Sequence, residues 1–110
     1  MKKDPKIFLI HILECIEAIE EYSKGLTEKQ FLKDQRAQDA IVRRFEIIGE
    51  ATKHLPSSLK DKYPKVQWRE IMSMRDRLIH EYFNVMMDLV WETVKKDLPK
   101  FKKQIQKMVQ

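Results

Sequence analysis

Within eight residues, from Arg75 to Tyr82, the chain carries an arginine, an aspartate, a histidine and a tyrosine, in the order Arg-Asp-Arg-Leu-Ile-His-Glu-Tyr. Such side chains bind anions and transfer protons. Asp76 and His80 are four residues apart, so on a helix they lie on one face. A carboxylate in that position can accept a hydrogen bond from the imidazole, orient it and favour its charged form. The pair is therefore a candidate acid-base unit.

Arg75 occupies a different face of the same stretch. It is seven residues, about two turns, from Tyr82, and the neighbours on that face are mostly apolar. An arginine in such surroundings requires an anionic or hydrogen-bonding partner. Five residues separate Arg75 from His80, which rotates them about 140° around a regular helix. For both side chains to reach one atom, the helix must bend, the arginine must reach around it, or two copies of the chain must meet across a dimer axis.

Two copies would build a shared groove suited to a phosphodiester. Arginine grips phosphate oxygens with a planar fork of donors and stabilises charge that develops on them. A histidine with a pKa near neutrality can take a proton from a ribose 2′-hydroxyl or give one to the leaving oxygen. Because the 2′-hydroxyl of RNA is an internal nucleophile, this reaction needs no metal and leaves a 2′,3′-cyclic phosphate. In such a site Arg75 and His80 would be catalytic, and Asp76 would support the histidine.

The elements that must position these residues are predicted to be helices. Only two glycines and four prolines occur, which argues against an all-β fold. We expect an all-α, up-and-down bundle of four to five helices. The expected helices cover about 5–22, a short segment from near 28, about 35–55, 68–82 and 87–97, and a last basic helix ending near 108, with a short turn or helix opening at 57–58.

Local signals mark several of these boundaries. Pro5 suits a first helical turn, Gly25 ends the first helix, and Thr27 followed by Gln30 is a capping-box signature. Pro99 predicts a bend between the last two helices. Apolar residues on the first and long helices recur every three or four positions, which predicts buried stripes: Ile12, Ile16 and Ile19, then Ala37, Ile41, Phe45, Ile48, Ala51 and Leu55.

Gly49 lies inside the long helix, where glycine costs about 1 kcal/mol relative to alanine. It indicates either the close approach of another helix or a tolerated imperfection. Trp68 and Trp91 occur at helical spacing and are predicted to be core residues.

Length and composition limit the class of protein. At 110 residues and 13.3 kDa, the chain is expected to form one domain, residues 1–110. A net charge of +5 and a pI near 9.3 are compatible with a polyanionic partner. Cys15 is the only cysteine, so no internal disulfide is possible and a reducing cytoplasm is compatible. No signal peptide or membrane span is predicted. His11, His54 and Cys15 lack companions at metal-ligand spacing, so we expect no metal site and no cofactor.

A homodimer is predicted from the apolar surface of the chain. The first two helices are apolar over broad faces, and methionines, which often belong to packed interfaces, bracket the motif. These methionines are Met72, Met74, Met86 and Met87.

Near the C-terminus, a group of lysines forms what is usually a solvated face. If these lysines bind RNA, the affinity should fall steeply with salt. They are Lys95, Lys96, Lys100, Lys102, Lys103 and Lys107.

The motif resembles the Arg-x4-His-x-Tyr signature of the HepT-like branch of the HEPN superfamily, small all-α ribonuclease toxins. The resemblance extends over nearly the whole chain. Residues 45–51, Phe-Glu-Ile-Ile-Gly-Glu-Ala, are similar to the family's Ile-Gly-Glu-Ala segment, and a Tyr-Pro and a tryptophan precede the motif helix at the family's spacing. The family's closing pattern is matched by Val90-Trp91-Glu92 and Asp97-Leu98-Pro99.

This resemblance implies a homodimer in which the motif Arg and His of both protomers, here Arg75 and His80, line a cleft. It implies metal-independent endoribonuclease activity and an MntA-like nucleotidyltransferase antitoxin that transfers AMP to the motif tyrosine, here Tyr82. A bulky anionic nucleotide there would repel RNA phosphates. The chain departs from the family at Asn84-Val85-Met86, where Gly-Val-Asp is usual, and at Asp76, where asparagine is more common.

Each residue also has a purely structural interpretation. His80 could complement a helix dipole, Arg75 could pair with Glu50 or Glu46 on the long helix, and Tyr82 could be a core tyrosine with a wetted hydroxyl. The alternative to a nuclease is a non-catalytic helical module that binds a nucleotide or the nucleotidyltransferase. Loss of RNA cleavage in His80→Ala would discriminate between them.

Overall fold

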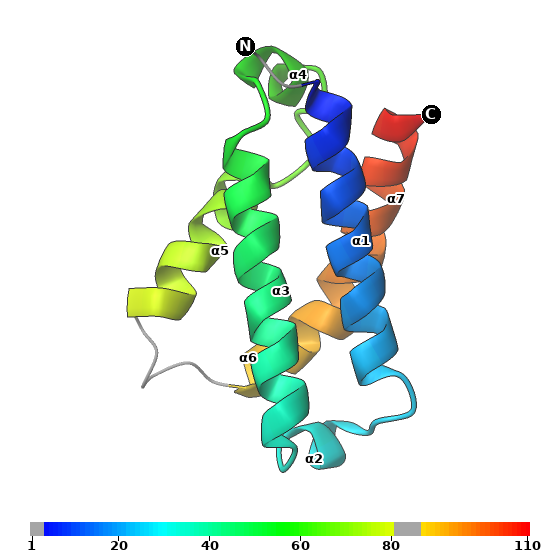
Figure 1. Cartoon of the computed structure of the whole chain (residues 1–110), viewed down its shortest axis with the longest axis vertical. Helices are drawn as coiled ribbons and strands as arrows, with labels where there is room; N and C mark the ends of the chain where they lie inside the picture. The colour runs from blue at the N-terminus through cyan, green and yellow to red at the C-terminus, as the bar shows by residue number, and fades with distance from the viewer. Residues whose placement is uncertain (1–3, 81–86) are drawn as a thin grey trace.

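A computed structural model of the chain describes residues 4–80 and 87–110, with the backbone alone at residues 79 and 80. Every regular element in these ranges is helical, as predicted (Figure 1). The elements are α1 (Pro5–Ser23), α2 (Glu28–Phe31), α3 (Gln35–Lys53), α4 (Ser57–Asp61), α5 (Trp68–His80), α6 (Met87–Glu92), the π-helical η2 (Thr93–Asp97) and α7 (Leu98–Val109).

The boundaries of the early helices follow the local signals. The Asp4 carboxylate accepts from the Lys6 N–H at 2.9 Å, with Pro5 in the first turn of α1. Past the end of that helix, Gly25 has φ +79°, the left-handed conformation that favours glycine. The predicted capping box of α2 is confirmed, with 3.1 Å from the Gln30 N–H to the Thr27 hydroxyl and 2.9 Å from the Thr27 N–H to the Gln30 side chain.

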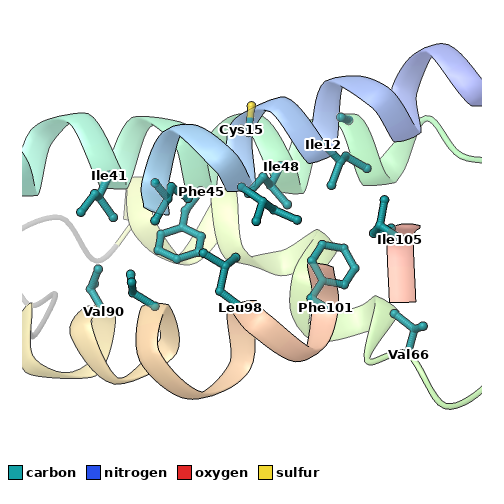
Figure 2. Packing of buried hydrophobic residues seen from close by; sticks show 14 of the residues in the cluster. Ile12, Cys15, Ile41, Phe45, Ile48, Val66, Val90, Leu98, Phe101 and Ile105 are labelled. Atoms are coloured by element: carbon teal, nitrogen blue, oxygen red, sulfur yellow. The ribbon is translucent and has the colours of Figure 1, made fainter. Parts of the chain in front are cut away.

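The core lies where α1, α3 and α7 pack together, and α5 packs on the other side of α3 (Figures 1 and 2). The predicted stripes of α1 and α3 are buried, apart from the partly covered Ala37, and both tryptophans are buried as expected. Complete burial of a large aliphatic side chain contributes about 1.5–3 kcal/mol. Fully covered side chains include Ile12, Ile16, Ile19, Phe31, Ile41, Ile48 and Ile105.

The last two helices are joined by a π-helical turn and not by the simple bend predicted at Pro99. The Leu98 N–H donates to the Thr93 carbonyl, five residues back. Pro99 lies in the first turn of α7, has no N–H, and its ring would clash with a carbonyl four residues earlier in a regular α-helix. Widening the preceding turn to the π form relieves that conflict. The prediction of one α-helix from about 87 to 97 was therefore wrong for its second half, because the α-helix ends at Glu92 and the π-helical turn follows.

No helix in the described ranges is both long and apolar enough to span a bilayer.

Candidate functional site

The start of α5 is fixed by Trp68. Its indole N–H lies 3.1 Å from the Lys60 carbonyl and 3.0 Å from the Tyr63 carbonyl, so it closes the turn between α4 and α5. The ring also meets Phe101 of α7 edge to face, with 6.5 Å between centroids. The tryptophan thus anchors the motif helix to the core at its N-terminal end.

Gly49 is the point where α5 crosses α3. A Cβ built at this position would lie 3.0 Å from the Ile71 carbonyl oxygen, 3.2 Å from the Arg75 nitrogen and 3.5 Å from the Arg75 Cβ. The prediction of a close helix approach is therefore confirmed, because these atoms are already nearer than a side chain would normally allow. This contact brings the backbone of Arg75 directly against the long helix.

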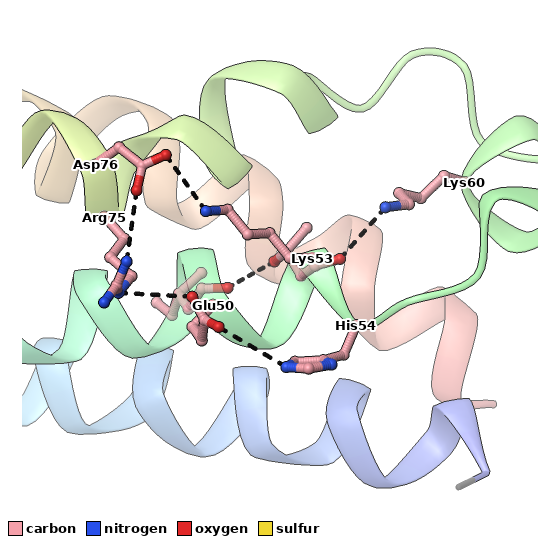
Figure 3. Close-up of polar contacts among 8 residues, drawn as sticks. Glu50, Lys53, His54, Lys60, Arg75 and Asp76 are labelled. Carbon is pink, nitrogen blue, oxygen red and sulfur yellow. Dashed lines mark hydrogen bonds and ion pairs between the residues drawn. The ribbon is translucent and has the colours of Figure 1, made fainter. Parts of the chain in front are cut away.

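Arg75 is held by two carboxylates at this crossing (Figure 3). Its Nε lies 3.5 Å from Glu50 Oε2 on α3, and its Nη1 lies 3.5 Å from Asp76 Oδ1 beside it on α5. The side chain remains 42% exposed. Of the two structural partners considered from the sequence, Glu50 makes the contact. Arg75 therefore has its required anionic partners and still presents its guanidinium to solvent.

Asp76 links α5 to α3 through a second cation. Its Oδ2 accepts from Lys53 Nζ at 3.3 Å, while Oδ1 faces Arg75. The expected contact of Asp76 with His80 stays a prediction, because the side chain of His80 is not described, although its backbone forms the last residue of α5. Tyr82, Asn84 and Met86 lie outside the described residues.

The polar cluster continues along α3. Glu50 Oε1 lies 3.8 Å from His54 Nε2, and the His54 ring stacks on Phe8 of α1 with 5.3 Å between centroids. Glu50, Lys53 and His54 share one helical face, because residues three and four apart are neighbours. Lys53 was not predicted from the sequence as a site residue, although its spacing of three from Glu50 puts both on one helical face.

The geometry determines what the cluster can do. The side chains are 35% to 58% exposed, so the ion pairs contribute little to stability. Their effect is to orient the side chains, above all the Arg75 guanidinium. Among the described side chains, ion pairs occupy Nε and Nη1 of Arg75, so Nη2 is available to an anionic ligand such as a phosphate. No group of three or more His, Cys, Asp or Glu side chains with metal-binding geometry occurs in residues 4–80 and 87–110.

Comparison with known proteins gives one consistent family. The family described as Ribonuclease HepT-like matches residues 12–108. A gamma-glutamylcyclotransferase and putative RNase of Methanocaldococcus jannaschii is 53% identical over all 110 residues, which span 50% of that protein. A putative RNase of Caldanaerobacter subterraneus is 45% identical over 98% of the chain and 96% of its own length.

A probable ribonuclease HepT of Thermococcus cleftensis is 44% identical over 98% of the chain and 98% of its own length. No solved structure matches the chain. The family match begins at Ile12 in the middle of α1 and covers the crossing at Gly49, the whole of α5 and the closing helices as far as Met108. The chain belongs to the HepT-like ribonuclease family of all-α proteins.

Proposed function

We propose that this protein is a metal-independent RNA endonuclease in which Arg75 and His80 carry the chemistry. The observation that supports this most directly is the placement of Arg75. Its guanidinium is fixed by Glu50 and Asp76 but 42% exposed, on the same helix as the family's histidine. An arginine serving only as a buried structural partner would have its remaining donors covered by protein.

In the proposed reaction, the Arg75 guanidinium binds non-bridging phosphate oxygens and stabilises the charge that builds up on them. His80 removes the proton from the ribose 2′-hydroxyl, whose oxygen attacks the adjacent phosphorus. The bond from phosphorus to the 5′-oxygen breaks, and that oxygen takes a proton from a histidine or from water. The products are a 2′,3′-cyclic phosphate and a 5′-hydroxyl. Asp76 orients His80 and stabilises the imidazolium that forms when His80 has accepted the proton.

The cleft is proposed to form between two protomers. A regular helix rotates Arg75 and His80 about 140° apart, so a second α5 supplies the missing group to each site. Two apolar side chains of α5 outside the pocket described below, Met72 and Leu78, are only half-buried, and this uncovered apolar area supports a partner there. A sedimentation mass of one chain at micromolar concentration would remove the dimer from the mechanism.

We further propose that the protein is the toxin of a toxin–antitoxin pair, with an MntA-like nucleotidyltransferase as antitoxin. Transfer of AMP from ATP to the Tyr82 hydroxyl, with release of pyrophosphate, would add a bulky anion to the motif and repel RNA. Incubation with ATP and a nucleotidyltransferase encoded by the neighbouring gene should produce an adenylyl adduct by intact mass. Tyr82→Phe should produce none.

The decisive test is cleavage of total RNA in EDTA by the unmodified protein, its His80→Ala variant and its Arg75→Ala variant. The wild type should leave cyclic phosphate ends, and each variant should be slower by about 10²- to 10⁴-fold. Arg77→Ala, on the same helix, is the matched control and should retain activity. Absence of cleavage by wild type carrying no adenylyl adduct would favour the non-catalytic module.

A further inference from the structure

A pocket of about 140 Å³ opens between α3, α5 and the η2–α7 segment. Its deep part is apolar and includes two aromatic rings, those of Phe45 and Phe101, which Figure 2 shows facing the core between α3 and α7. On the α5 side it is lined by Ile71 and Met74. Met74 directly precedes Arg75, so the pocket lies next to the candidate catalytic residue along the helix.

The mouth of the pocket is polar. Lys65 and Gln67, from the segment before α5, face Lys100 and Gln104 of α7, and Asp97 of η2 adds a carboxylate. Amide side chains both donate and accept, a carboxylate accepts, and lysines donate to phosphate. An occupant with an apolar flat face, polar edges and a flanking negative charge would fit this arrangement.

A row of lysines leads away from this mouth along α7. Lys100, Lys103 and Lys107 are three and four residues apart, so they follow one face, with a rise of about 4.5 and 6 Å between neighbours along the axis. All are exposed, and no ion pair to an aspartate or glutamate involves them within the described part of the chain. By contrast, Lys102 on another face pairs with Glu20 at 2.8 Å. The row is therefore uncompensated positive charge beside an apolar pocket.

We propose that the pocket holds one unpaired base of the RNA substrate, with a preference for pyrimidines, while Lys65 and the α7 lysine row (Lys100, Lys103 and Lys107) bind the flanking phosphates. This inference rests on the proposed RNA substrate. An apolar cavity of roughly 150 Å³ accepts benzene, so the pocket suits a single six-membered ring better than a fused purine. Phe45 and Phe101 are almost fully buried, so they form an apolar wall and not a stacking platform, and the polar edges of the base would meet the polar residues of the mouth.

Single-stranded RNA fits these features better than an acidic peptide does. Carboxylate side chains would pair with the lysines but would leave the apolar, aromatic part of the pocket empty. A nucleotide carries a ring and a phosphate in one unit, and Lys65 and Lys100 are themselves part of the pocket lining, so both parts could be bound together. The strand held in this way would pass along α7 toward α5.

Binding of fluorescein-labelled single-stranded RNA tests the lysine row, with His80→Ala as the background so that the RNA stays intact. Replacing Lys100, Lys103 and Lys107 together by glutamine should weaken binding about tenfold. It should also reduce the slope of log affinity against log salt by about 2. The matched control replaces Lys24, Lys29 and Lys33 by glutamine, since these exposed lysines lie in α2 or beside it in sequence, and Figure 1 shows α2 at the opposite end of the bundle from the C-terminus. Equal losses in both triple variants would overturn the proposal.

Filling the pocket tests the base subsite separately. Gln104→Trp places a ring in its mouth and should weaken binding of an oligouridine about tenfold, whereas Gln106→Trp, exposed on another face of α7, should not. Abasic sites placed at successive positions along the RNA should weaken binding to the background protein about tenfold at one position. Binding to Gln104→Trp should be weakened in this way at no position. A purine bound as tightly as a pyrimidine at that position would remove the preference.

These measurements separate the two proposals. Cleavage by wild type with unchanged RNA affinity in the lysine and Gln104 variants would overturn the subsite and leave the nuclease intact. RNA binding that depends on these residues without any cleavage would support the subsite and contradict the nuclease. An acidic peptide that binds and depends on the same residues, with no RNA binding, would overturn both.

Discussion

Glu50 and Arg75 meet across the crossing of α3 and α5, with 3.5 Å between Oε2 and Nε, one residue after the glycine that lets the helices touch. The carboxylate and the close approach are thus adjacent in sequence and act at the same place. Gly49 brings the backbone of the motif helix near, and Glu50 holds its arginine. This gives the Ile-Gly-Glu-Ala segment a physical role in this chain: it positions Arg75.

Glu50→Gln should lower RNA cleavage without unfolding the protein. Both side chains are nearly half exposed, so the pair contributes little to the free energy of unfolding, about 0.5 kcal/mol or less. Loss of orientation at Arg75 should nevertheless reduce kcat by roughly tenfold. Single-turnover cleavage and urea denaturation of the same preparations measure the two effects. Glu46→Gln, one turn earlier on α3, is the control and should change neither; an unaffected kcat in Glu50→Gln would limit Glu50 to a passive role.

Gly49→Ala should destabilise the protein although alanine is the better helix former. The new Cβ would lie 3.0 Å from the Ile71 carbonyl and 3.2 Å from the Arg75 nitrogen, so the α5 backbone must move. We expect a net loss of about 1–3 kcal/mol in the free energy of unfolding, against the gain of about 1 kcal/mol from propensity.

The control for that substitution is Ala40→Gly, which makes the reverse change in the same helix. It should cost about 1 kcal/mol through propensity alone. Gly49→Ala would then destabilise the protein through the helix contact, and Ala40→Gly would destabilise it through helix propensity. Stabilisation by Gly49→Ala in a urea titration would mean that the two helices do not touch at this position.

Features that depend on neighbours in sequence were predictable. The capping box at Thr27 and Gln30 involves residues three apart, and the stripes of α1 and α3 follow from helical periodicity. The glycine at position 49 indicated a close approach, but not which helix would come near. Contacts such as Lys53 with Asp76 join residues 23 apart in sequence, and only the packing angle of α5 on α3 fixes them.

The region around Pro99 shows where a local rule is incomplete. Proline forbids a regular helical hydrogen bond, which correctly marked an irregularity. Whether the chain bends or widens into a π turn depends on packing. Here Val94 within the irregular turn and Leu98, Phe101 and Ile105 after it are all buried, so a wider turn keeps them on the core without breaking the helix. That choice is a tertiary effect that the sequence pattern does not contain.

Cys15 should be protected from thiol reagents until the protein opens. Its side chain is 0% exposed between α1 and α3, and Arg44 Nη1 donates to its sulfur at 3.7 Å. That contact, followed by one with Tyr22, raises the pKa of Arg44, so the guanidinium remains charged beside the thiol. Reaction with a chromogenic disulfide should be slow in buffer and complete in denaturant. Ser58→Cys in a Cys15→Ala background supplies an exposed thiol for comparison, and equal rates for the two proteins would contradict this packing.

Trp68→Phe should be more destabilising than Trp91→Phe, although both remove a buried indole. The Trp68 N–H donates to the carbonyls of Lys60 and Tyr63, and phenylalanine would leave both acceptors without that donor at the start of α5. Trp91 instead packs on Phe31, with ring centroids 5.1 Å apart, and phenylalanine can keep much of that contact. The difference in the free energy of unfolding should be about 1 kcal/mol or more.

Because Trp68 fixes the motif helix, the same substitution should also reduce RNA cleavage at temperatures where the protein is still folded. Trp91→Phe should leave cleavage near the wild-type rate under those conditions. Urea denaturation and the EDTA cleavage assay at one temperature compare the two variants directly. If both lose stability and activity equally, the loss is one of aromatic packing in general. The indole hydrogen bonds would then have no special role in placing Arg75.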